Sequence, residues 1–243
     1  TFDASVEEIY PTLAAGGTLA MVSRDELKDI QLLNQFIRQQ QVTVVSASPF
    51  ILNELNQLPP FPHIRIYISG GDVLKSEYVT RLLRSAKVYN TYGPTEATVC
   101  ATYYRVPDTP DVHPLPIGRP VANAAVYIMN RNSTDVMPIG VPGEICISGR
   151  GVTRGYMNRP ELTEQQFVAN PWIPGERMYK TGDLGRYLED GQIQFLGRKD
   201  QQVKVRGYRI EPGEIEKSLL QHPHIQDGVV LVQEVLPSMQ ELC

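Results

Sequence analysis

Short apolar strands that alternate with helical patterns are the feature that most restricts how this chain can fold. Runs rich in valine, isoleucine and tyrosine lie at Val42–Ala47, Ile64–Ser69 and Lys87–Tyr92. Helical patterns separate these runs at Pro49–Leu58 and Asp72–Ser85. Because parallel strands need crossover connections, the alternation predicts an α/β lobe built on a parallel sheet.

Two more helices are predicted before the first strand. Ser23 and Glu26 have the spacing of a capping box, which starts a helix over Arg24–Gln40. Its apolar stripe is formed by Leu27, Ile30, Leu33 and Ile37. An earlier helix should begin near Asp3, and Pro11 would remove one of its hydrogen bonds and kink it.

After about Pro107 the pattern becomes rich in β-strands and turns. Strands are predicted at Ala124–Met129 and Gly143–Ser148, and Asp190-Gly191 is a strong hairpin signal between Arg186–Leu188 and Gln192–Leu196. We therefore predict a second, β-rich lobe.

The last part of the chain predicts the start of a small α/β lobe. It reads as a strand at Gln202–Arg206, a turn at Gly207, a helix from about Pro212 to Gln221 and a strand near Gly228–Val235. The expected domains are 1–115 for the α/β lobe, 116–199 for the β-rich lobe and 200–243 for the small lobe.

Composition argues against several classes of protein. The chain has 23 lysines and arginines against 27 aspartates and glutamates, with no block of like charge, so a nucleic-acid partner is not expected. The longest apolar run, Leu13–Val22, is too short to cross a membrane. The three cysteines form neither a disulfide framework nor a zinc cluster, which favours a cytoplasmic location.

A first candidate site is the segment Asn90-Thr-Tyr-Gly-Pro-Thr-Glu96, which leaves a predicted strand and enters a turn. Open α/β sheets bind ligands at this edge. Tyr92 offers a flat face for a base, and Thr95 and Glu96 offer the oxygen ligands that Mg²⁺ prefers beside phosphates. An ordinary Gly-Pro turn is the alternative interpretation.

Two further clusters fit a nucleotide. Tyr179-Lys-Thr-Gly-Asp183 is expected in a loop before the hairpin, where Asp183 could accept two hydrogen bonds from a ribose. Ile68-Ser-Gly-Gly-Asp72 is a strand that runs into glycines and a helix start, so backbone could approach a ligand closely. Taken singly, the first also fits a turn with a solvated aspartate, and the second lacks a complete dinucleotide fingerprint.

The fourth cluster lies at the beginning of the chain. If a helix starts near Asp3, Asp3 and Glu7 share one face and Glu8 turns away from it. Two carboxylates on one face favour a cation between them. The alternative is a solvated acidic first turn, which the helix dipole also favours.

Five segments in one order, covering the whole chain, closely resemble successive core motifs of nonribosomal peptide synthetase adenylation domains, in the adenylate-forming superfamily. They are Phe2-Asp-Ala-Ser5, Asn90–Glu96, Gly143–Gly149 with Arg154–Thr163, Tyr179–Asp183 and Gly197–Gly207. The resemblance implies the adenylate-forming fold: an α/β lobe with a parallel sheet, a β-rich barrel-like lobe and a small C-terminal α/β lobe. The aspartate of Phe-Asp-Ala-Ser separates amino-acid activators from acyl and aryl relatives.

The resemblance also implies a reaction. In that family an amino-acid carboxylate is joined to the α-phosphate of ATP with the help of Mg²⁺, and pyrophosphate leaves. The aminoacyl group then passes to the phosphopantetheine thiol of a peptidyl carrier domain. The expected partners are therefore an amino acid, a carrier domain and other synthetase modules that make an antibiotic or toxin peptide.

Individual residues take roles by the same resemblance. Thr95 would contact a phosphate, and Glu96 would bind Mg²⁺. Asp200 would be the hinge of the small lobe, with a plain linker carboxylate as the alternative, and Lys204–Gly207 would be the loop that lines the thiol tunnel. The nucleotide contacts are Gly70, Gly71, Asn90, Tyr92, Asp183 and Arg198. Among these, Tyr92 would stack on adenine, Asn90 would bond its exocyclic amine, and Asp183 would accept both ribose hydroxyls.

Asp3 would pair with the substrate ammonium, ahead of a side-chain pocket. The pocket positions are Ala4, Glu7, Ser46, Ile68, Gly70, Thr91, Val99 and Cys100. Small residues leave the pocket long, and Glu7 places a carboxylate in it, which is costly without a partner. We expect a long basic side chain, arginine first and lysine or ornithine next, with tyrosine as a second substrate. A small neutral residue with water around Glu7 is the alternative.

Two parts of the family pattern are absent, namely the phosphate loop before Phe-Asp-Ala-Ser and the lysine in an Asn-Gly-Lys setting near the family's C-terminus. We expect that both ends are cut from something longer and that this piece alone is inactive. Two other interpretations stay open. Asp3 argues against an acyl- or aryl-CoA ligase, and the intact Thr95, Glu96 and Asp183 argue against a non-catalytic remnant.

Overall fold

The computed structural model describes residues 3–110, 114–131, 133–199, 203–205, 208–222, 224–236 and 239–243. The chain divides into two compact units, Thr1–Gly197 and Arg198–Cys243. The boundary predicted between residues 115 and 116 lies inside the larger unit, and the division into three pieces stays a prediction.

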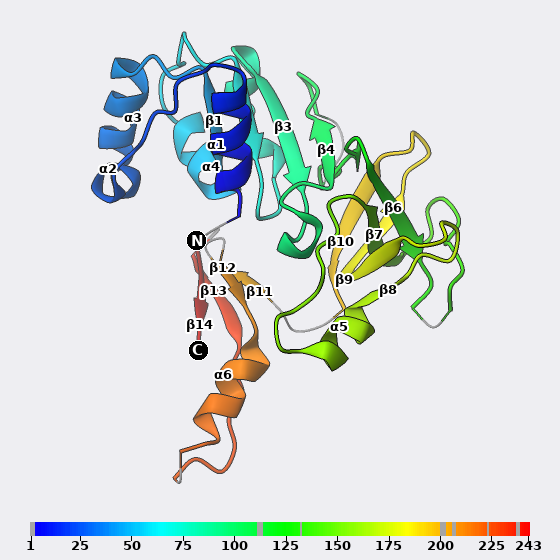
Figure 1. Ribbon diagram of the computed structural model, residues 1–243. Helices are drawn as coiled ribbons and strands as arrows, with labels where there is room; N and C mark the ends of the chain where they lie inside the picture. Colours follow the sequence, from blue (N-terminus) through cyan, green and yellow to red (C-terminus); the bar gives the residue numbers. More distant parts are fainter. Residues whose placement is uncertain are drawn as a thin grey trace. The chain divides into compact units, whose positions relative to one another are not determined.

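The larger unit contains a five-stranded sheet in the order β1-β2-β3-β4-β5 (Figure 1). β1 (Val44–Ala47), β2 (Ile66–Ser69) and β3 (Lys87–Tyr92) are parallel to one another, which confirms the predicted centre of the α/β lobe. β4 (Thr102–Arg105) and β5 (Arg119–Pro120) continue the sheet in antiparallel pairs, so the whole sheet is mixed.

The helices described in the larger unit are short. They are α1 (Ser5–Ala14), α2 (Arg24–Lys28), α3 (Ile30–Gln39), α4 (Pro49–Asn56) and α5 (Pro160–Gln166), with 3-10 turns η1 (Ser76–Tyr78), η2 (Leu82–Arg84) and η3 (Thr95–Ala97). Pro11 lies inside α1 as expected. Among the described residues, no helix combines the length and the apolar character that a membrane span requires.

The two faces of the first sheet meet different helices. Tyr67 and Val88 are partners across β2 and β3 and belong to a buried core together with apolar residues of α3 and α4. Side chains alternate along a strand, so Ser46 points to the opposite face. α1 lies on that opposite face, where its Glu7 accepts a hydrogen bond from Ser46 (Figure 1).

The single helix predicted over Arg24–Gln40 is broken into α2 and α3 at Asp29. The capping box of Ser23 and Glu26 is present, so the predicted start is confirmed. Asp29, however, has an extended backbone, and its carboxylate accepts hydrogen bonds from two N–H groups at the start of α3. An aspartate that caps a new helix in this way interrupts the preceding one.

The helix predicted over Asp72–Ser85 is wrong, since only η1 and η2 form there. The buried amide of Asn56 supplies the reason. Its Nδ2 donates to the carbonyl of Glu77 at 3.0 Å, and its Oδ1 accepts from the N–H groups of Arg81 at 2.8 Å and Leu82 at 3.2 Å. In an α-helix the Arg81 N–H would bond the Glu77 carbonyl, so the asparagine takes both ends of that bond.

A second sheet of the larger unit has the order β10-β9-β7-β6, with β8 paired to β9. Its strands are β6 (Ala124–Met129), β7 (Gly143–Gly149), β8 (Phe167–Ala169), β9 (Arg177–Tyr187) and β10 (Ile193–Arg198). The predicted hairpin is confirmed, because Leu188 N donates to Gln192 O between β9 and β10. A bridge between Gly118 and Ile193 connects the two sheets.

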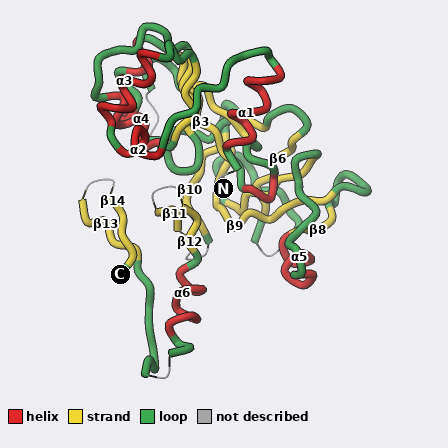
Figure 2. Tube along the Cα trace, turned by 60° about the vertical axis from the view of Figure 1, so that its left-hand side comes forward, coloured by secondary structure: helices red, strands yellow, loops and turns green. Residues whose placement is uncertain are grey.

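The smaller unit holds two antiparallel pairs and one helix (Figure 2). The pairs are β11 (Val203–Val205) with β12 (Tyr208–Ile210) and β13 (Val232–Leu236) with β14 (Met239–Leu242), and the helix is α6 (Pro212–Leu219). The predicted first strand and helix are confirmed with shorter bounds. The last predicted strand begins later than Gly228, β12 and β14 were not expected, and the turn at Gly207 lies outside the described residues.

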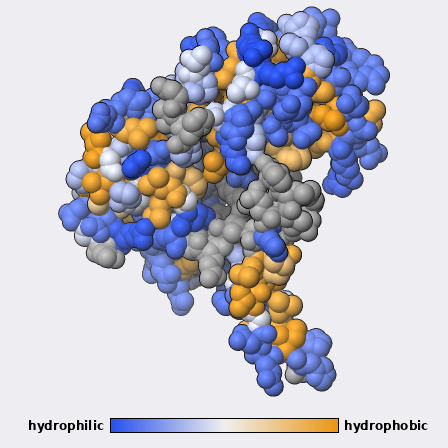
Figure 3. All heavy atoms as spheres, turned by 180° about the vertical axis from the view of Figure 1, so that it is seen from behind, coloured by the Kyte–Doolittle hydropathy of each residue, from blue (hydrophilic) through white to orange (hydrophobic). Residues whose placement is uncertain are grey.

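Apolar side chains lie at the surface of the smaller unit around α6 (Figure 3). The large exposed ones described there are Leu219, Leu220, Val229, Leu231 and Leu242.

Asn56→Ala should lower the free energy of unfolding of this chain by roughly 2–4 kcal/mol. A buried polar group that loses its partner costs about 1–3 kcal/mol. The bond to the Leu82 N–H is buried, whereas the bonds to the Glu77 carbonyl and the Arg81 N–H are part-buried and cost less when lost. Urea denaturation followed by circular dichroism measures the change. Asn53→Ala, on the same helix but less buried, is the matched control, and equal losses for both variants would contradict the role given to Asn56.

Candidate functional site

The candidate site begins where β3 ends. After Tyr92 the chain turns at Gly93-Pro94, and η3 then presents an exposed Thr95 and a buried Glu96. Gly93 is required at this turn, because a Cβ there would lie 2.3 Å from the carbonyl oxygen of Val99. The predicted strand-to-turn geometry of the segment is confirmed.

The residues that follow η3 are held in an unusual backbone conformation. Thr98 and Val99 have φ angles of 59° and 67°, in the left-handed region that β-branched residues rarely enter. Such strain costs on the order of 1–3 kcal/mol per residue and persists only where the surroundings enforce it. Here Thr98 Oγ1 donates to the carbonyl of Gly151 at 2.6 Å. The strained turn presents Val99 and Cys100, two of the expected pocket residues.

Tyr92 and Asp183 are brought together although 91 positions separate them. The Tyr92 hydroxyl donates to Asp183 Oδ2 at 2.5 Å, and Asp183 is buried. The expectation that Asp183 lies in a loop is wrong, because Tyr179–Asp183 is part of β9.

A bulge in β9 explains how a strand residue can serve as a site residue. The pairing of β7 with β9 shifts register after Glu144, and Gly182 has a φ of 75°. The N–H of Gly182 donates to Glu144 Oε1 at 3.1 Å, and the N–H of Asp183 donates to Thr181 Oγ1 at 2.9 Å. Bulges of this kind redirect side chains at functional sites.

Glu96 also has a tyrosine partner that comes from another segment. The Tyr156 hydroxyl donates to Glu96 Oε1 at 2.8 Å and lies 3.2 Å from the hydroxyl of Tyr179 on β9. Sequence reasoning assigned no role to Tyr156, Tyr179 or Glu144, although all three stand inside the quoted motifs. In the sequence, these residues are marked only by being a tyrosine or a glutamate inside one of the quoted motifs.

Three of the expected substrate residues meet on the α1 side of the first sheet. The Ser46 hydroxyl donates to Glu7 Oε1 at 3.4 Å. The pKa of Glu7 lies above its ordinary value, mainly because burial disfavours the charged form, while the bond from Ser46 acts in the opposite direction. Burial raises the pKa of the Cys100 thiol to about 12, and the nearby charge of Glu7 adds to the effect.

Gly70 and Thr91 lie side by side at the ends of β2 and β3. A Cβ on Gly70 would lie 2.9 Å from Thr91 Oγ1, which itself donates to the carbonyl of Ser69 at 3.0 Å. The helix start expected after Gly71 is not formed; Gly71 instead has a φ of 87°. Ile68 is half-buried in β2, two residues before Gly70, and its register partner in β3 is Tyr89.

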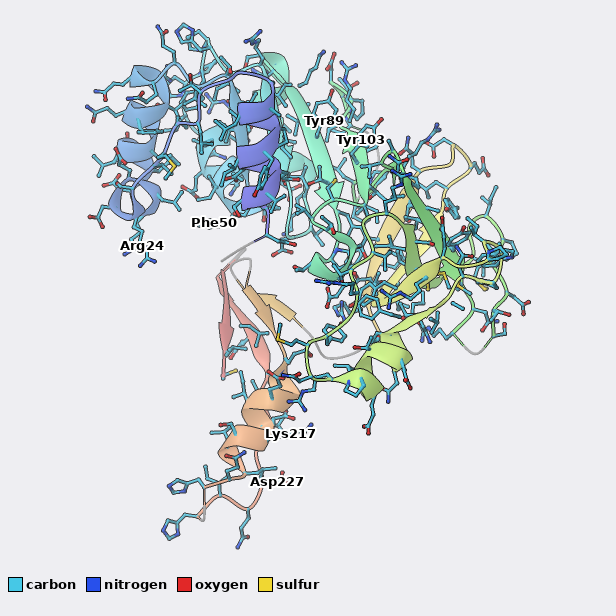
Figure 4. The ribbon with its side chains drawn as sticks, viewed as in Figure 1. Arg24, Phe50, Tyr89, Tyr103, Lys217 and Asp227 are labelled. Atoms are coloured by element: carbon cyan, nitrogen blue, oxygen red, sulfur yellow. The ribbon has the colours of Figure 1, made fainter. Side chains whose placement is uncertain are left out.

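Two tyrosines lie on the α1 face of the first sheet, on β3 and β4. The rings of Tyr89 on β3 and Tyr103 on β4 lie 6.5 Å apart between centroids, and Figure 4 shows both side chains. Tyr103 is the register partner of Thr91, so the ring pair stands beside the expected pocket residues.

The remaining expected residues come from several parts of the chain. Asn90 is buried, and its Nδ2 donates to the carbonyl of Pro116 at 2.8 Å. Asp3 and Ala4 are half-buried just before α1. Arg198 is the last residue of β10 and the point at which the smaller unit begins. Lys204 lies on β11, and Asp200 falls outside the described residues.

Two surface hollows of the larger unit lie elsewhere. One is lined by Arg38, Phe61 and His63, and the other by residues that include Val44 and Lys87, at the beginnings of β1 and β3. Ligands of open α/β sheets bind at the carboxyl ends of the strands, which is the opposite edge. Neither hollow therefore belongs to the candidate site, which is defined by the side-chain contacts at the carboxyl ends of β1, β2 and β3.

The family described as AMP-binding enzyme matches residues 1–157. Bacitracin synthase 2 of Bacillus licheniformis is 48% identical over 246 residues, and gramicidin S synthase 2 of Brevibacillus brevis is 44% identical over 247 residues. Both matches cover 100% of this chain but only 9% and 6% of the two synthases, so the chain spans less than a tenth of either relative.

Solved structures give the same result for the fold. PA1221, an NRPS protein containing adenylation and PCP domains, has a TM-score of 0.87 and 32% identity, over 99% of this chain and 50% of that one. NpsA-ThdA, an artificially fused adenylation-PCP di-domain NRPS from Klebsiella oxytoca, has a TM-score of 0.82 and 25% identity, over 99% and 49%. The adenylate-forming fold expected from the sequence is confirmed.

Glu7→Gln should stabilise this chain slightly, and more at neutral than at acidic pH. The pKa of Glu7 is raised in the folded state, so protonation of Glu7 favours folding. This contribution to stability is complete below the ordinary carboxyl pKa, and it is lost as the pH rises through the raised pKa of the folded chain. We expect a gain below about 1 kcal/mol at pH 7.5, since solvent screens a half-buried group, and a smaller gain near pH 4.5.

Urea denaturation at the two pH values measures this difference. Glu164→Gln, at an exposed position on α5, is the control and should change stability little at either pH. A loss of stability for Glu7→Gln at pH 7.5 would show that the carboxylate is satisfied inside the folded chain.

Proposed function

This chain belongs to the AMP-binding enzyme family, and we propose that it activates an amino acid as its aminoacyl-adenylate in nonribosomal peptide synthesis. The observation that carries the proposal is the hydrogen bond between Tyr92 and Asp183, which joins two distant motifs at the carboxyl end of β3. Glu96 follows in η3, four residues after Tyr92. Glu7 accepts a hydrogen bond from Ser46 on the face of the same sheet that α1 covers.

The residues around β3 suit a nucleotide. The Tyr92 ring offers a face for adenine, and the Asp183 carboxylate can accept hydrogen bonds from a ribose diol while the tyrosine hydroxyl holds it in place. Gly70 and Gly71 leave room for backbone to approach the other face of the base. ATP is therefore the proposed co-substrate, with Arg198 as a further contact on the ribose side.

Thr95 and Glu96 fit the needs of a magnesium ion next to phosphates. Mg²⁺ is usually held by one or two carboxylates together with phosphate oxygens, and the donors here are one carboxylate and one hydroxyl. When bound, the ion would neutralise charge that develops on the phosphates. Glu96 would hold it, and Thr95 would contact a phosphate directly.

The α1 side of the sheet suits the amino acid. Asp3 would pair with the ammonium, and Glu7, Ser46 and Cys100 would surround the end of the side chain. The carboxylate of Glu7 is half-buried and carries a raised pKa, so a cationic ligand would relieve its lost solvation. We infer a long basic side chain, with arginine as the first candidate and lysine or ornithine next.

The same proposal assigns the partners. The similarity to NRPS proteins that contain PCP domains supports transfer of the aminoacyl group to a carrier-domain phosphopantetheine and work beside other synthetase modules. Asp200 would be the hinge of the smaller unit, and Lys204–Gly207 would line the path of the thiol.

Asp183→Ala in the full-length protein should raise the ATP concentration needed for half-maximal amino-acid-dependent pyrophosphate exchange about 10- to 150-fold. Losing hydrogen bonds to a charged group costs about 1.5–3 kcal/mol. The ranking of amino acids should not change, because a ribose contact contributes binding common to ground and transition states. Asp190→Ala, at the exposed hairpin, is the control. An altered ranking with unchanged ATP dependence would contradict the assignment.

Glu7→Gln in the full-length protein should reduce arginine-dependent pyrophosphate exchange about 10- to 150-fold and leave neutral amino acids unaffected. The reason is the loss of a charge-assisted hydrogen bond, worth about 1.5–3 kcal/mol. A panel of amino acids that includes lysine, ornithine and tyrosine measures the preference of wild type and variant. If arginine and neutral substrates fall equally, or if no basic amino acid is activated by wild type, Glu7 does not select the substrate.

A further inference from the structure

The hydrogen bonds around Glu96 have a fixed direction. A carboxylate can only accept, so the Tyr156 hydroxyl donates its proton to Glu96 Oε1 at 2.8 Å. The 3.2 Å contact between the two tyrosine hydroxyls then needs Tyr179 as its donor. The result is a chain that runs from Tyr179 to Tyr156 to Glu96, in which each bond strengthens the next.

Tyr156 is itself held firmly. Its backbone N–H donates to Thr163 Oγ1 at 3.0 Å, and Thr163 lies in the middle of α5. Its ring meets Phe167 edge-on, with centroids 5.4 Å apart, and Tyr179 packs on the same phenylalanine at 4.9 Å. The rings of both tyrosines are therefore held by contact with the same residue, Phe167 of β8.

We propose that Tyr156 is a positioning residue that orients the Glu96 carboxylate for Mg²⁺, with Tyr179 supporting it from behind. This inference rests on the proposed function, because it names what aligns the metal ligand of that same site. The terminal torsion of a glutamate has a broad energy minimum, so the carboxylate plane needs an external partner to fix it. A partner of this kind typically changes metal affinity 10- to 100-fold when it is removed.

The position of Tyr156 in the sequence gives the proposal a second support. Tyr156 comes from the segment Arg154–Thr163 and Tyr179 from Tyr179–Asp183, whereas Glu96 closes Asn90–Glu96. One chain of hydrogen bonds thus connects three motifs that the sequence presents separately. The segment Arg154–Thr163 has no proposed contact with the nucleotide or the amino acid. The hydrogen bond from Tyr156 gives this segment a place in the same site.

Tyr156→Phe in the full-length protein tests the proposal through binding alone. The affinity for a non-hydrolysable ATP analogue is measured by calorimetry in EDTA and at a series of Mg²⁺ concentrations. We expect the affinity in EDTA to stay within about twofold of wild type, while the Mg²⁺ concentration at half-maximal enhancement rises about 10-fold. Tyr179→Phe should raise that concentration by a smaller factor, because it leaves the bond from Tyr156 to Glu96 intact.

Two controls separate positioning from a loss of structure. Tyr127→Phe removes a hydroxyl from another tyrosine of the same sheet, stacked on Trp172, and should leave the Mg²⁺ dependence unchanged. In a Glu96→Gln background, Tyr156→Phe should have no further effect on it. Thermal unfolding of each variant without ligand reports folding, and if Tyr156→Phe does not fold, Tyr179→Phe provides the test.

The outcomes are distinct. If wild type shows Mg²⁺-dependent binding and Tyr156→Phe matches it within twofold, the positioning role is wrong and the proposed function stands. If Tyr156→Phe shifts the Mg²⁺ dependence equally with and without Glu96, the tyrosine does not act through Glu96, and the inference is also overturned. If wild type binds no ATP analogue at any Mg²⁺ concentration, the proposed function itself fails.

Discussion

Two buried carboxylates, Glu96 and Asp183, are the constraint on which the larger unit depends. Each is 7% exposed, and a carboxylate removed from water must recover its hydrogen bonds inside the protein. Each one finds a tyrosine hydroxyl from a distant segment, Tyr156 for Glu96 and Tyr92 for Asp183. The Asp183 pair joins the end of β3 to β9 of the second sheet, and the Glu96 pair joins η3 to the segment between β7 and α5. The position of each carboxylate therefore depends on a contact between segments that are far apart in the sequence.

The bulge in β9 shows how the same requirement shapes backbone. In a regular strand the N–H groups of Gly182 and Asp183 would be available to a neighbouring strand, but here both are bonded by side chains, Glu144 and Thr181. These side chains compensate for the hydrogen bonds that the register shift removes. The buried Glu144 is thus a condition for the bulge, and the bulge is a condition for the position of Asp183. The contacts that stabilise the bulge therefore also position the carboxylate that is proposed to bind the ribose.

The sequence predicted what depends on local patterns and missed what depends on distant side chains. Lys87–Tyr92 and Ala124–Met129 match β3 and β6 in both bounds, because strand periodicity and turn residues are local signals. The helix expected at Asp72–Ser85 fails because Asn56, in another element, takes its hydrogen bonds. Likewise, Asp183 was recognised by its motif, yet its place in a strand and its bond to Tyr92 follow from a pairing across 91 positions.

If Glu7 faces the substrate side chain as proposed, its surroundings favour selection by exclusion of the wrong ligand. In the folded chain its carboxylate has lost solvent and has a single weak hydrogen bond from Ser46 as its described side-chain partner. The thiol of Cys100 cannot supply a counter-charge, and its pKa near 12 keeps it neutral, so it adds no repulsion either. A neutral side chain would complete the desolvation of Glu7 without replacing the lost interactions, whereas a cation would replace them. In the proposed pocket, discrimination would then arise because the wrong ligand leaves a charge unpaired, which is a stronger penalty than one missing apolar contact.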